Sequence, residues 1–568
     1  MILWGGWPIF NEALEALRKR RMTMELSMTM ALVAAVVIGE TFTALIILLF
    51  VLIAEHLEGL TVERGQRALD DLRRWLPDQV VVLRDGREHS IATSELKLGE
   101  VVVVRPAERI PADGQVVAGH SFADEAAITG EPLAAEKVTG DRVFAGSINQ
   151  AGVLEVRVDS LGSQTAFGRI LEVVEQARHA RAPVEKLADR LAARLVYFAL
   201  ACAAVTFLVT GDVRDTISVI IVAGACGVAA GTPLAILGAL GGAARQGAIV
   251  KSGRFLEALG TIDTVVLDKT GTLTTGQARI RSVRAAQDLS SEEVLRIAAA
   301  AECRSEHPLA RAVLEKAREL QVSFAPPEDF SYTPGLGVAC RVAGEEVLVG
   351  SRRLMESRGI SSDGWRKGSQ AATEILVGRA GRLLGVLEVE DPVRPEAGRA
   401  LEALRGLGTR TILVTGDSLD VARAVASRLG IDELEAGMLP EDKKRLVEGL
   451  VAAGRRVAMV GDGINDAPAL AVAHVGVAMG SGTDVTRECA DVVLLGNDLE
   501  RLVGTLVLAR RCRRIIGFNF GGTIAVDLLG ILLAGIGCLT PILAAFIHVS
   551  SELAFILNSA RLLPRLRR

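Results

Sequence analysis

The segment DKTGTLT, from Asp268 to Thr274, combines residue types that can transfer a phosphoryl group. It follows the apolar residues TVVL, so the carboxylate of Asp268 stands at the end of a predicted buried strand. Lys269, Gly271 and the threonines around them, beginning with Thr270, can surround a phosphate. An aspartate in this setting can act as a nucleophile and form an acyl phosphate. A simple turn would account for DKTG alone, but it would not account for all seven residues of DKTGTLT.

Two further strand ends carry matching chemistry. GDGINDAP, residues 461–468, brings Asp462, Asn465 and Asp466 to the end of the predicted strand RVAMV, and such oxygen ligands suit Mg²⁺. TGD follows the strand RTILV and comprises Thr415, Gly416 and Asp417; Lys443 in LPEDK supplies a cation. Because parallel strands present their carboxyl ends at one edge of a sheet, we expect these groups to meet there.

The pattern of strands and helices predicts several domains. Residues from about 60 to 190 contain β-rich segments such as VVVVRP and GVLEVRVDS, which are separated by Gly, Pro and Asp turns. Residues from about 245 to 510 alternate strands with helices, as in a doubly wound parallel sheet. About 115 residues separate the first and second of its strands, which is enough for an inserted small domain.

The composition indicates that part of the chain lies in lipid. Half of the 568 residues are hydrophobic, although 23% are charged. Each long apolar run is close to the roughly 20 residues that span a bilayer, which predicts six membrane helices in three pairs. The runs are residues 25–39, 40–57, 194–210, 216–243, 514–536 and 539–557.

Basic clusters predict the orientation of these helices. They occur at residues 18–21, 510–514 and 565–568, on the side where an even helix count places both termini. By the positive-inside rule that side is cytoplasmic, and both polar segments then face the cytoplasm. The N-terminus lacks a cleavable-signal layout, because its apolar part precedes its positive charges.

Other bulk features exclude little. The seven cysteines form no CxxC pair and three of them lie in apolar runs, which argues against a disulfide framework. The net charge of −4 argues neither for nor against nucleic acid, and we expect no nucleic-acid partner. The sequence does not identify a metal-delivery protein.

The chain resembles the P-type ATPases, whose phosphorylation site carries DKTGTLT, TGD and GDGINDAP. ITGEP, residues 128–132, matches the loop of the family's actuator domain. The resemblance implies an aspartyl phosphate on Asp268, with Mg²⁺ held by Asp268, Thr270, Asp462 and Asp466. It also implies that Thr129, Gly130 and Glu131 belong to the loop that hydrolyses the aspartyl phosphate, where Glu131 positions the water.

AECRSEHPLA, GLG and VLVGSRRL resemble the nucleotide-binding domain of the heavy-metal-transporting members of the family. The resemblance implies that ATP is bound by Glu302, His307, Pro308, Gly335, Gly337 and Gly350. HP alone would more often mark the start of a helix, but the combined set favours ATP binding.

The resemblance also suggests a site for the transported ion. Members of this subfamily have Cys-Pro-Cys in the fourth membrane helix of this part, followed by a later proline that corresponds to Pro233. Here Gly224-Ala225-Cys226 takes that place, and only the last cysteine remains. Asp527 and His548 fall where relatives carry polar residues, and Glu552 lies one turn after His548. One thiolate, one imidazole and one or two carboxylates suit a divalent ion better than Cu⁺.

The expected protein is therefore an ATP-driven exporter of a divalent transition-metal ion in the plasma membrane. A membrane-anchored phosphatase would need neither TGE nor a nucleotide domain. The missing Cys-Pro-Cys favours a regulatory ATPase that has lost transport, whereas the intact phosphorylation motifs oppose it. A pump for protons or another light cation, acting through Asp527 and Glu552, stays open.

We expect a helical membrane domain combined with a β-rich actuator domain, an α/β haloacid-dehalogenase-like phosphorylation domain and an inserted α/β nucleotide-binding domain. Most relatives have two more helices at the start, so the chain is either truncated there or a six-helix form. The predicted divisions are residues 1–24 (N-terminal segment), 25–60 (helices 1 and 2), 61–190 (actuator), 191–245 (helices 3 and 4), 246–277 with 391–508 (phosphorylation), 278–390 (nucleotide binding), 509–560 (helices 5 and 6) and 561–568 (basic tail).

Overall fold

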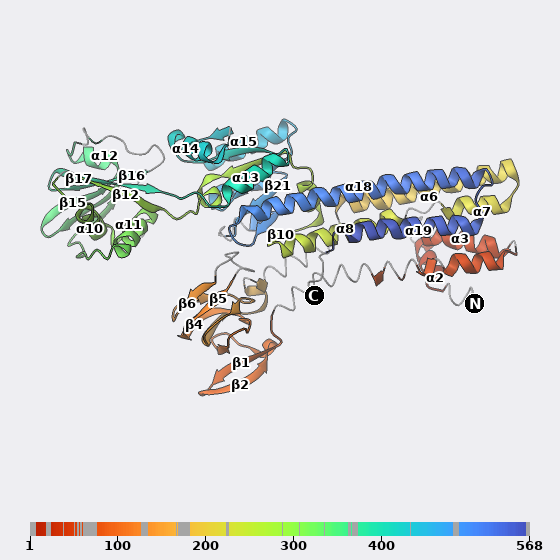
Figure 1. Cartoon of the computed structure of the whole chain (residues 1–568), viewed down its shortest axis with the longest axis horizontal. Coiled ribbons are helices and arrows are strands. Elements are labelled where there is room, and N and C mark those ends of the chain that lie inside the picture. Colours follow the sequence, from red (N-terminus) through yellow and green to blue (C-terminus); the bar gives the residue numbers. More distant parts are fainter. Residues whose placement is uncertain are drawn as a thin grey trace. The chain divides into compact units, whose positions relative to one another are not determined.

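The structure is a computed structural model of the chain (Figure 1). It describes residues 7–18, 24–37, 39–49, 51–53, 56, 59–60, 76–125, 134–165, 167–168, 182–222, 226–286, 288–305, 307–333, 336–361, 365, 373–431, 433–480 and 488–563. The chain divides into two units, one of residues 1–261, 491–496 and 501–568 and the other of residues 262–490 and 497–500.

The membrane part of the first unit is built from helices. Three of those described are long and apolar enough to cross a bilayer: α6 (Pro183–Thr210), α18 (Leu499–Gly535) and α19 (Pro541–Ala560). The shorter helices are α2 (Trp7–Arg18), α3 (Met24–Val37), an apolar segment Thr41–Ile53, α7 (Val213–Val222) and α8 (Cys226–Arg245). The count of six membrane helices stays a prediction.

Two of the long helices begin well before their apolar runs. α6 begins at Pro183 rather than near residue 194, and α18 begins at Leu499 rather than near residue 514. Hydropathy finds only the apolar part of a helix, whereas the backbone hydrogen bonds of a helix can continue into polar sequence. The basic cluster at residues 510–514 therefore lies within α18 instead of preceding it.

Specific residues set the ends of these helices. Gly211 follows α6 in the left-handed conformation, at φ 66°, where glycine carries no steric penalty. Pro541 occupies the first turn of α19, and the Thr540 hydroxyl accepts a hydrogen bond from the Leu543 amide. Pro233 lies inside α8, where it removes one backbone hydrogen bond without ending the helix.

The β-rich part of the first unit holds two antiparallel sheets. The larger has the order β2-β1-β3-β9-β4-β7, and the smaller has the order β6-β5-β8. Alternating valines of these strands form a buried core, as the β-rich pattern predicts. The strands are β1 (Gln79–Arg84), β2 (Arg87–Ala92), β3 (Val101–Val104), β4 (Asp113–Gly119), β5 (Ser121–Asp124), β6 (Ala135–Lys137), β7 (Arg142–Val143), β8 (Ile148–Asn149) and β9 (Leu154–Ser160).

The second unit contains a parallel sheet. β11 (Thr264–Asp268) lies between β18 (Arg410–Val414) and β20 (Val457–Gly461), and β19 (Glu433–Glu435) and β21 (Val475–Ala478) extend the sheet outward. The residues of β11 and β20 are all buried, which explains their continuous apolar sequence. The helices of this region are α13 (Ala397–Gly406), α14 (Leu419–Leu429), α15 (Pro440–Ala452) and α16 (Ala467–Val472).

The segment inserted after β11 forms an antiparallel sheet in the order β12-β17-β16-β15-β14-β13. A buried cluster of Ala, Val, Ile and Leu side chains joins this sheet to its helices. Its elements are β12 (Arg279–Ala285), α10 (Ser291–Glu302), α11 (Pro308–Glu319), β13 (Phe330–Thr333), β14 (Gly337–Val342), β15 (Glu345–Gly350), α12 (Arg352–Ser357), β16 (Thr373–Arg379) and β17 (Arg382–Glu390).

A buried asparagine connects the two sheets of the β-rich part. The Asn149 amide donates to the carbonyl oxygens of Val104, at 2.9 Å, and Gly152, at 2.6 Å. Its oxygen accepts from the Ser121 hydroxyl at 2.5 Å. Each of these partners would lose a buried hydrogen bond if Asn149 were removed.

We expect Asn149→Ala to destabilise this part by about 2–3 kcal/mol, because it leaves buried polar groups unsatisfied. Hydrogen exchange of the full chain should accelerate at least tenfold in peptides covering β3 and β8. Gln115→Ala is the matched control, because the Gln115 hydrogen bonds are exposed. Equal exchange in the Asn149 variant and the wild type would contradict this account.

Candidate functional site

Asp268 is the last residue of β11, at the carboxyl edge of the parallel sheet. It pairs in register with Val414 of β18, and Leu267 before it pairs with Val460 of β20. Side chains that follow these three strands are therefore brought to one place, as the sequence predicts. Asp268 is 5% exposed.

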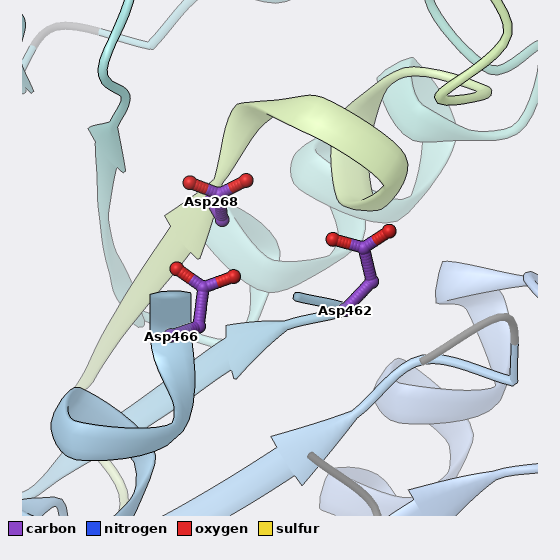
Figure 2. Close-up of side chains that lie close together, drawn as sticks. All are labelled: Asp268, Asp462 and Asp466. Atoms are coloured by element: carbon purple, nitrogen blue, oxygen red, sulfur yellow. The ribbon is translucent and has the colours of Figure 1, made fainter. Parts of the chain in front are cut away.

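Three carboxylates gather at this edge (Figure 2). Oxygen atoms of Asp268, Asp462 and Asp466 lie within 4.8 Å of one another. Asp462 directly follows β20, and Asp466 closes the short 3₁₀ turn before α16. This is the one group of three potential metal ligands in the part of the chain that the structure describes.

Lys443 bridges two of these carboxylates. Its ammonium group lies 2.5 Å from Asp268 Oδ1 and 2.8 Å from Asp466 Oδ1. Lys443 lies in the first turn of α15 and is itself buried. Burial lowers the pKa of Lys443, but the charges of Asp268 and Asp466 outweigh that effect and raise the pKa, so the ammonium stays charged.

The crowding of negative charge shifts both neighbouring carboxyl groups. Burial, and then the charge of Asp466, raises the pKa of Asp268 to about 7, although Lys443 opposes the shift. Burial and the charge of Asp466 likewise raise the pKa of Asp462 to about 6. A further cation between the carboxylates would relieve this repulsion, so the site is suited to binding one.

Gly271 is required by the geometry of the turn after Asp268. Its φ is +71°, and a Cβ atom added to it would lie 1.6 Å from Asp462 Oδ2. Only glycine therefore lets the turn approach Asp462 so closely. Thr270, next to it, is exposed at the surface of the turn.

Lys269 and the TGD residues form a second contact. The Lys269 ammonium lies 2.5 Å from Asp417 Oδ2. The Thr415 hydroxyl, which is buried, accepts a hydrogen bond of 3.1 Å from the Asp417 amide. Gly416 lies between them, and a Cβ there would come within 3.4 Å of only the Met438 carbonyl oxygen. The motif thus orders Asp417 beside Lys269.

Two residues of this site were missed by the sequence analysis. The guanidinium of Arg394 is buried and donates to the carbonyl oxygens of Gly271, at 2.8 Å, and Thr272, at 3.0 Å. Asp391 accepts from the Thr274 hydroxyl at 2.5 Å and from the Gly276 amide at 2.9 Å. Both hold the turn that carries Gly271. The signal was the segment EDPVRP at the end of β17, which lies far away in the sequence.

The inserted domain contains a cavity of about 180 Å³. Of the residues predicted to bind ATP, Glu302, His307, Gly337 and Gly350 line it. The side chain of Pro308 and the whole of Gly335 lie outside the described residues. The cavity lining also includes Tyr332, Ser351 and Glu374, which the sequence analysis did not single out.

Gly337 and Gly350 have a structural reason to be glycine. They are paired across β14 and β15, and a Cβ at Gly350 would lie 2.2 Å from the Leu336 carbonyl oxygen. A Cβ at Gly337 would lie 2.3 Å from the Val349 carbonyl oxygen. The close approach of the two strands shapes one wall of the cavity.

Aromatic rings stand beside this cavity. The ring centroids of His307 and Tyr332 are 6.4 Å apart, with an interplanar angle of 38°. Glu302 at the end of α10 is buried, and this burial raises its pKa to about 7. Apolar residues such as Leu309, Leu336 and Val338 complete the lining. Apolar walls with a few polar groups are typical of small-molecule sites.

The predicted actuator loop lies outside the described residues, and this applies to Thr129, Gly130 and Glu131. Its flanking strands are described: β5 pairs with β6, with Ala123 opposite Ala135. Glu125 and Lys137, on either side of the loop, form a buried ion pair at 2.8 Å. The two ends of the loop are therefore held together.

The predicted ion-site residues Asp527, His548 and Glu552 are buried in α18 and α19. His548 Nε2 lies 4.0 Å from Glu552 Oε2, and the imidazole hydrogen-bonds the main chain at Val222. Asp527 does not form a three-ligand group with this pair within the described residues. The side chain of Cys226 lies outside them.

Two family models match the chain. The P-type ATPase actuator domain matches residues 74–175, and the haloacid dehalogenase-like hydrolase model matches residues 262–474. The second match includes Asp268 and strands β11, β18, β19 and β20, and it ends just before β21. These matches agree with the β-rich and α/β parts described above.

Curated relatives cover nearly the whole chain. A zinc-exporting P-type ATPase of Mycobacterium marinum is 40% identical over 99% of this chain and 79% of its own length. A manganese-exporting P-type ATPase of Mycobacterium bovis is 39% identical over 99% of this chain and 80% of its own length. A probable cadmium-transporting ATPase of Alkalihalophilus pseudofirmus is 34% identical over 98% of this chain and 80% of its own length.

A solved structure also resembles the chain over its full length. The crystal structure of a zinc-transporting PIB-type ATPase in the E2.Pi state has a TM-score of 0.65 and 33% sequence identity. The match covers 99% of this chain and 94% of that one.

We expect Gly271→Ala to reduce phosphorylation of Asp268 by more than about 100-fold, since the added Cβ collides with Asp462 and the φ of +71° strains any other residue. The acid-stable phosphate formed from labelled ATP measures the effect. Gly454→Ala is the matched control, because Gly454 has a φ of +80° but open space around it. Equal loss in both variants would show that backbone strain, rather than the collision, is responsible.

The buried carboxyl group of Glu302 is expected to make the free energy of unfolding depend on pH. Its pKa is raised from 4.5 to about 7 in the folded protein, so unfolding releases a proton between these pH values. The free energy of unfolding should therefore fall by up to about 3 kcal/mol as the pH rises from 4.5 to 7. Glu302→Gln should remove this loss.

Calorimetric unfolding of the wild type and Glu302→Gln at pH 5 and pH 8 tests this. The difference in unfolding temperature, variant minus wild type, should be several degrees larger at pH 8 than at pH 5. Glu292→Gln changes an exposed residue of the same helix and should give no such gain. An equal difference at both pH values for Glu302→Gln would refute the prediction.

Proposed function

The chain belongs to the heavy-metal type of P-type ATPase, and we propose that it exports a divalent transition-metal cation from the cytoplasm, driven by ATP. The named relatives export zinc or manganese or transport cadmium, which supports a divalent ion. The observation that carries the proposal is that one chain contains both a buried carboxylate site at Asp268 and buried ionisable residues inside its membrane helices.

Asp268 is the residue that we assign as the phosphoryl acceptor. An oxygen of its carboxylate attacks the γ-phosphorus of ATP, the bond from that phosphorus to the β–γ bridging oxygen breaks, and ADP leaves. Lys443, at 2.5 Å, favours the ionised form of the carboxylate and can contact the transferred phosphoryl group. Thr415, Gly416 and Asp417 order the neighbouring turn beside Lys269.

The donor set around Asp268 fits Mg²⁺. Asp268, Asp462 and Asp466 offer hard carboxylate oxygens within 4.8 Å of one another, and Gly271 leaves room beside Asp462. We propose that these residues, with Thr270, hold the ion. When bound, Mg²⁺ offsets the negative charge on the phosphoryl oxygens.

ATP is expected to bind in the cavity of the inserted domain. Glu302, His307, Gly337 and Gly350 line this cavity, and we assign Pro308 and Gly335 to the same site from the family pattern. The apolar lining and the nearby His307 and Tyr332 rings suit a flat base.

The aspartyl phosphate must be hydrolysed in a later step. We assign this to the actuator loop, in which Glu131 orients the attacking water and Thr129 and Gly130 shape the turn. The buried Glu125–Lys137 pair supports this role, since it fixes the ends of the loop. Water attacks the phosphorus, the bond to the Asp268 oxygen breaks, and inorganic phosphate leaves.

The ion site is assigned to Cys226, Asp527, His548 and Glu552. Ionisable groups inside a membrane helix are costly and mark ion pathways. Two contacts support convergence: His548 bonds the main chain at Val222, and a Cβ on Gly530 would meet Val222 Cγ2 at 2.4 Å. Asp527 lies one turn before Gly530 in α18. The end of α7 therefore lies close to the last part of α18 and to the middle of α19.

The chain is an integral membrane protein. We propose that it lies in the plasma membrane with both termini in the cytoplasm, because the basic clusters at residues 18–21, 510–514 and 565–568 then share the cytoplasmic side. The domain divisions given from the sequence are proposed for the same topology.

ATP hydrolysis by the purified chain in lipid, measured across divalent and monovalent metals, tests the proposal. We expect one or a few divalent ions to stimulate hydrolysis at least fivefold, and Asp268→Asn to abolish it. Cys226→Ala and His548→Ala should raise the metal concentration needed for half-maximal activity. Activity that depends on Asp268 but ignores every metal would contradict metal export and favour a light cation or an uncoupled enzyme.

A further inference from the structure

α18 carries a line of buried polar residues along one face. Asn519, Thr523 and Asp527 follow one another at intervals of four residues and are at most 3% exposed. This spacing places them on one side of the helix, about 6 Å apart along its axis. Such a line inside a membrane helix needs polar partners.

The first of these residues has partners. The Asn519 amide donates to the Ser559 hydroxyl at 2.9 Å and to the Phe555 carbonyl at 3.2 Å, and its oxygen accepts from Asn558 at 2.8 Å. A Cβ at Gly231 of α8 would lie 3.1 Å from the Ser559 hydroxyl. α18, α19 and α8 are thus packed tightly at the level of Asn519.

The next two residues differ from Asn519. Among the described residues, the Thr523 hydroxyl and Asp527 Oδ2 are buried without a hydrogen-bond partner. An unsatisfied hydroxyl or carboxylate oxygen is costly in a protein interior, and a bound ion or water removes that cost.

Four other helical threonines differ from Thr523 in the partner of the hydroxyl. The hydroxyls of Thr210, Thr216, Thr232 and Thr505 each donate to the carbonyl oxygen four residues earlier in a helix, at 2.7–2.8 Å. Thr523 makes no such bond and, like Thr29 of α3, has a buried hydroxyl that its own helix backbone does not satisfy.

The contacts of α18 locate Thr523 and Asp527 relative to the other helices. Asn519 lies beside Gly231 of α8, and Gly530 lies beside Val222 at the end of α7. Thr523 and Asp527 fall between these levels, opposite the start of α8. Counting from the Asn519–Ser559 contact along the antiparallel α19, Asp527 is level with the His548–Glu552 pair.

We propose that the Thr523 hydroxyl is a ligand of the transported cation, acting together with Asp527 one turn away. This inference rests on the proposed export function and adds a residue to its ion site. A hydroxyl and a carboxylate are hard oxygen ligands, so they favour a hard divalent cation such as Mn²⁺ over a soft one. The tight Asn519 contact bounds this part of the site at one end.

The test uses the full chain in lipid and measures the concentrations of Mn²⁺ and Cd²⁺ that give half-maximal ATP hydrolysis. Thr523→Val removes the hydroxyl with little change in volume and should raise the Mn²⁺ value about tenfold. Thr523→Ser keeps the hydroxyl and should stay within about twofold of the wild type. Thr505→Val is the matched control, since it alters a buried threonine of α18 whose hydroxyl is bonded, and it should change nothing.

A second variant keeps the test decisive if Thr523→Val fails to fold. Thr523→Cys replaces the hard ligand by a soft one and should lower the Cd²⁺ value relative to the Mn²⁺ value at least tenfold. Phosphorylation of each variant by inorganic phosphate, with Mg²⁺ but without Mn²⁺ or Cd²⁺, reports folding independently of binding of the transported ion.

The outcomes are distinguishable from a failure of the proposed function. If Asp527→Asn raises the half-maximal metal concentration while Thr523→Val and Thr523→Cys leave both values unchanged, the role of Thr523 is refuted and metal export stands. If no metal stimulates the wild type, metal export itself is refuted and the inference falls with it.

Discussion

The structure of the candidate site at Asp268 depends on the repulsion between three carboxylates, two of which are buried from water. Asp268, Asp462 and Asp466 lie within 4.8 Å of one another, and cations beside such a group stabilise it. Lys443 supplies one positive charge directly, and Arg394 holds the turn that carries Gly271. The parallel sheet makes the cluster possible, since three adjacent strands end at one edge.

The same physical constraint applies inside the membrane helices. Asp527, His548 and Glu552 are buried where charge is costly, and the structure brings three helix segments together around Val222. In both places a bound cation would relieve the repulsion between crowded carboxylates or satisfy polar groups that lack a partner. In the proposed cycle, ATP hydrolysis at one site is coupled to ion movement at the other.

The sequence was most informative where function depends on short motifs. Asp268, Asp462 and Asp466 could be predicted to meet, because each follows a buried strand and parallel strands share an edge. Arg394 and Asp391 were missed, since their partners lie more than 100 residues away and the segment EDPVRP does not by itself indicate which turn it contacts. The four-residue spacing of Thr523 and Asp527 was visible in the sequence. Whether the Thr523 hydroxyl finds a hydrogen-bond partner depends on side-chain packing, which the sequence does not show.

Helix boundaries were predicted less well than helix existence. Hydropathy located the apolar parts of α6 and α18 but missed their polar first turns, because a helix does not need to end where lipid ends. Gly337 and Gly350 illustrate a related limit. The sequence assigned them to ATP binding, whereas the structure gives a steric reason for glycine in the close pairing of β14 with β15. The two roles are compatible.

The location of the phosphate tests the central claim most directly. The chain would be incubated with ATP labelled at the γ-phosphate, quenched in acid and treated with borohydride, which reduces an acyl phosphate, and the peptides would be identified by mass spectrometry. The account predicts reduction at the side chain of Asp268 and at no other carboxylate. Continued ATP hydrolysis without reduction at Asp268, or with reduction at another carboxylate, would contradict it.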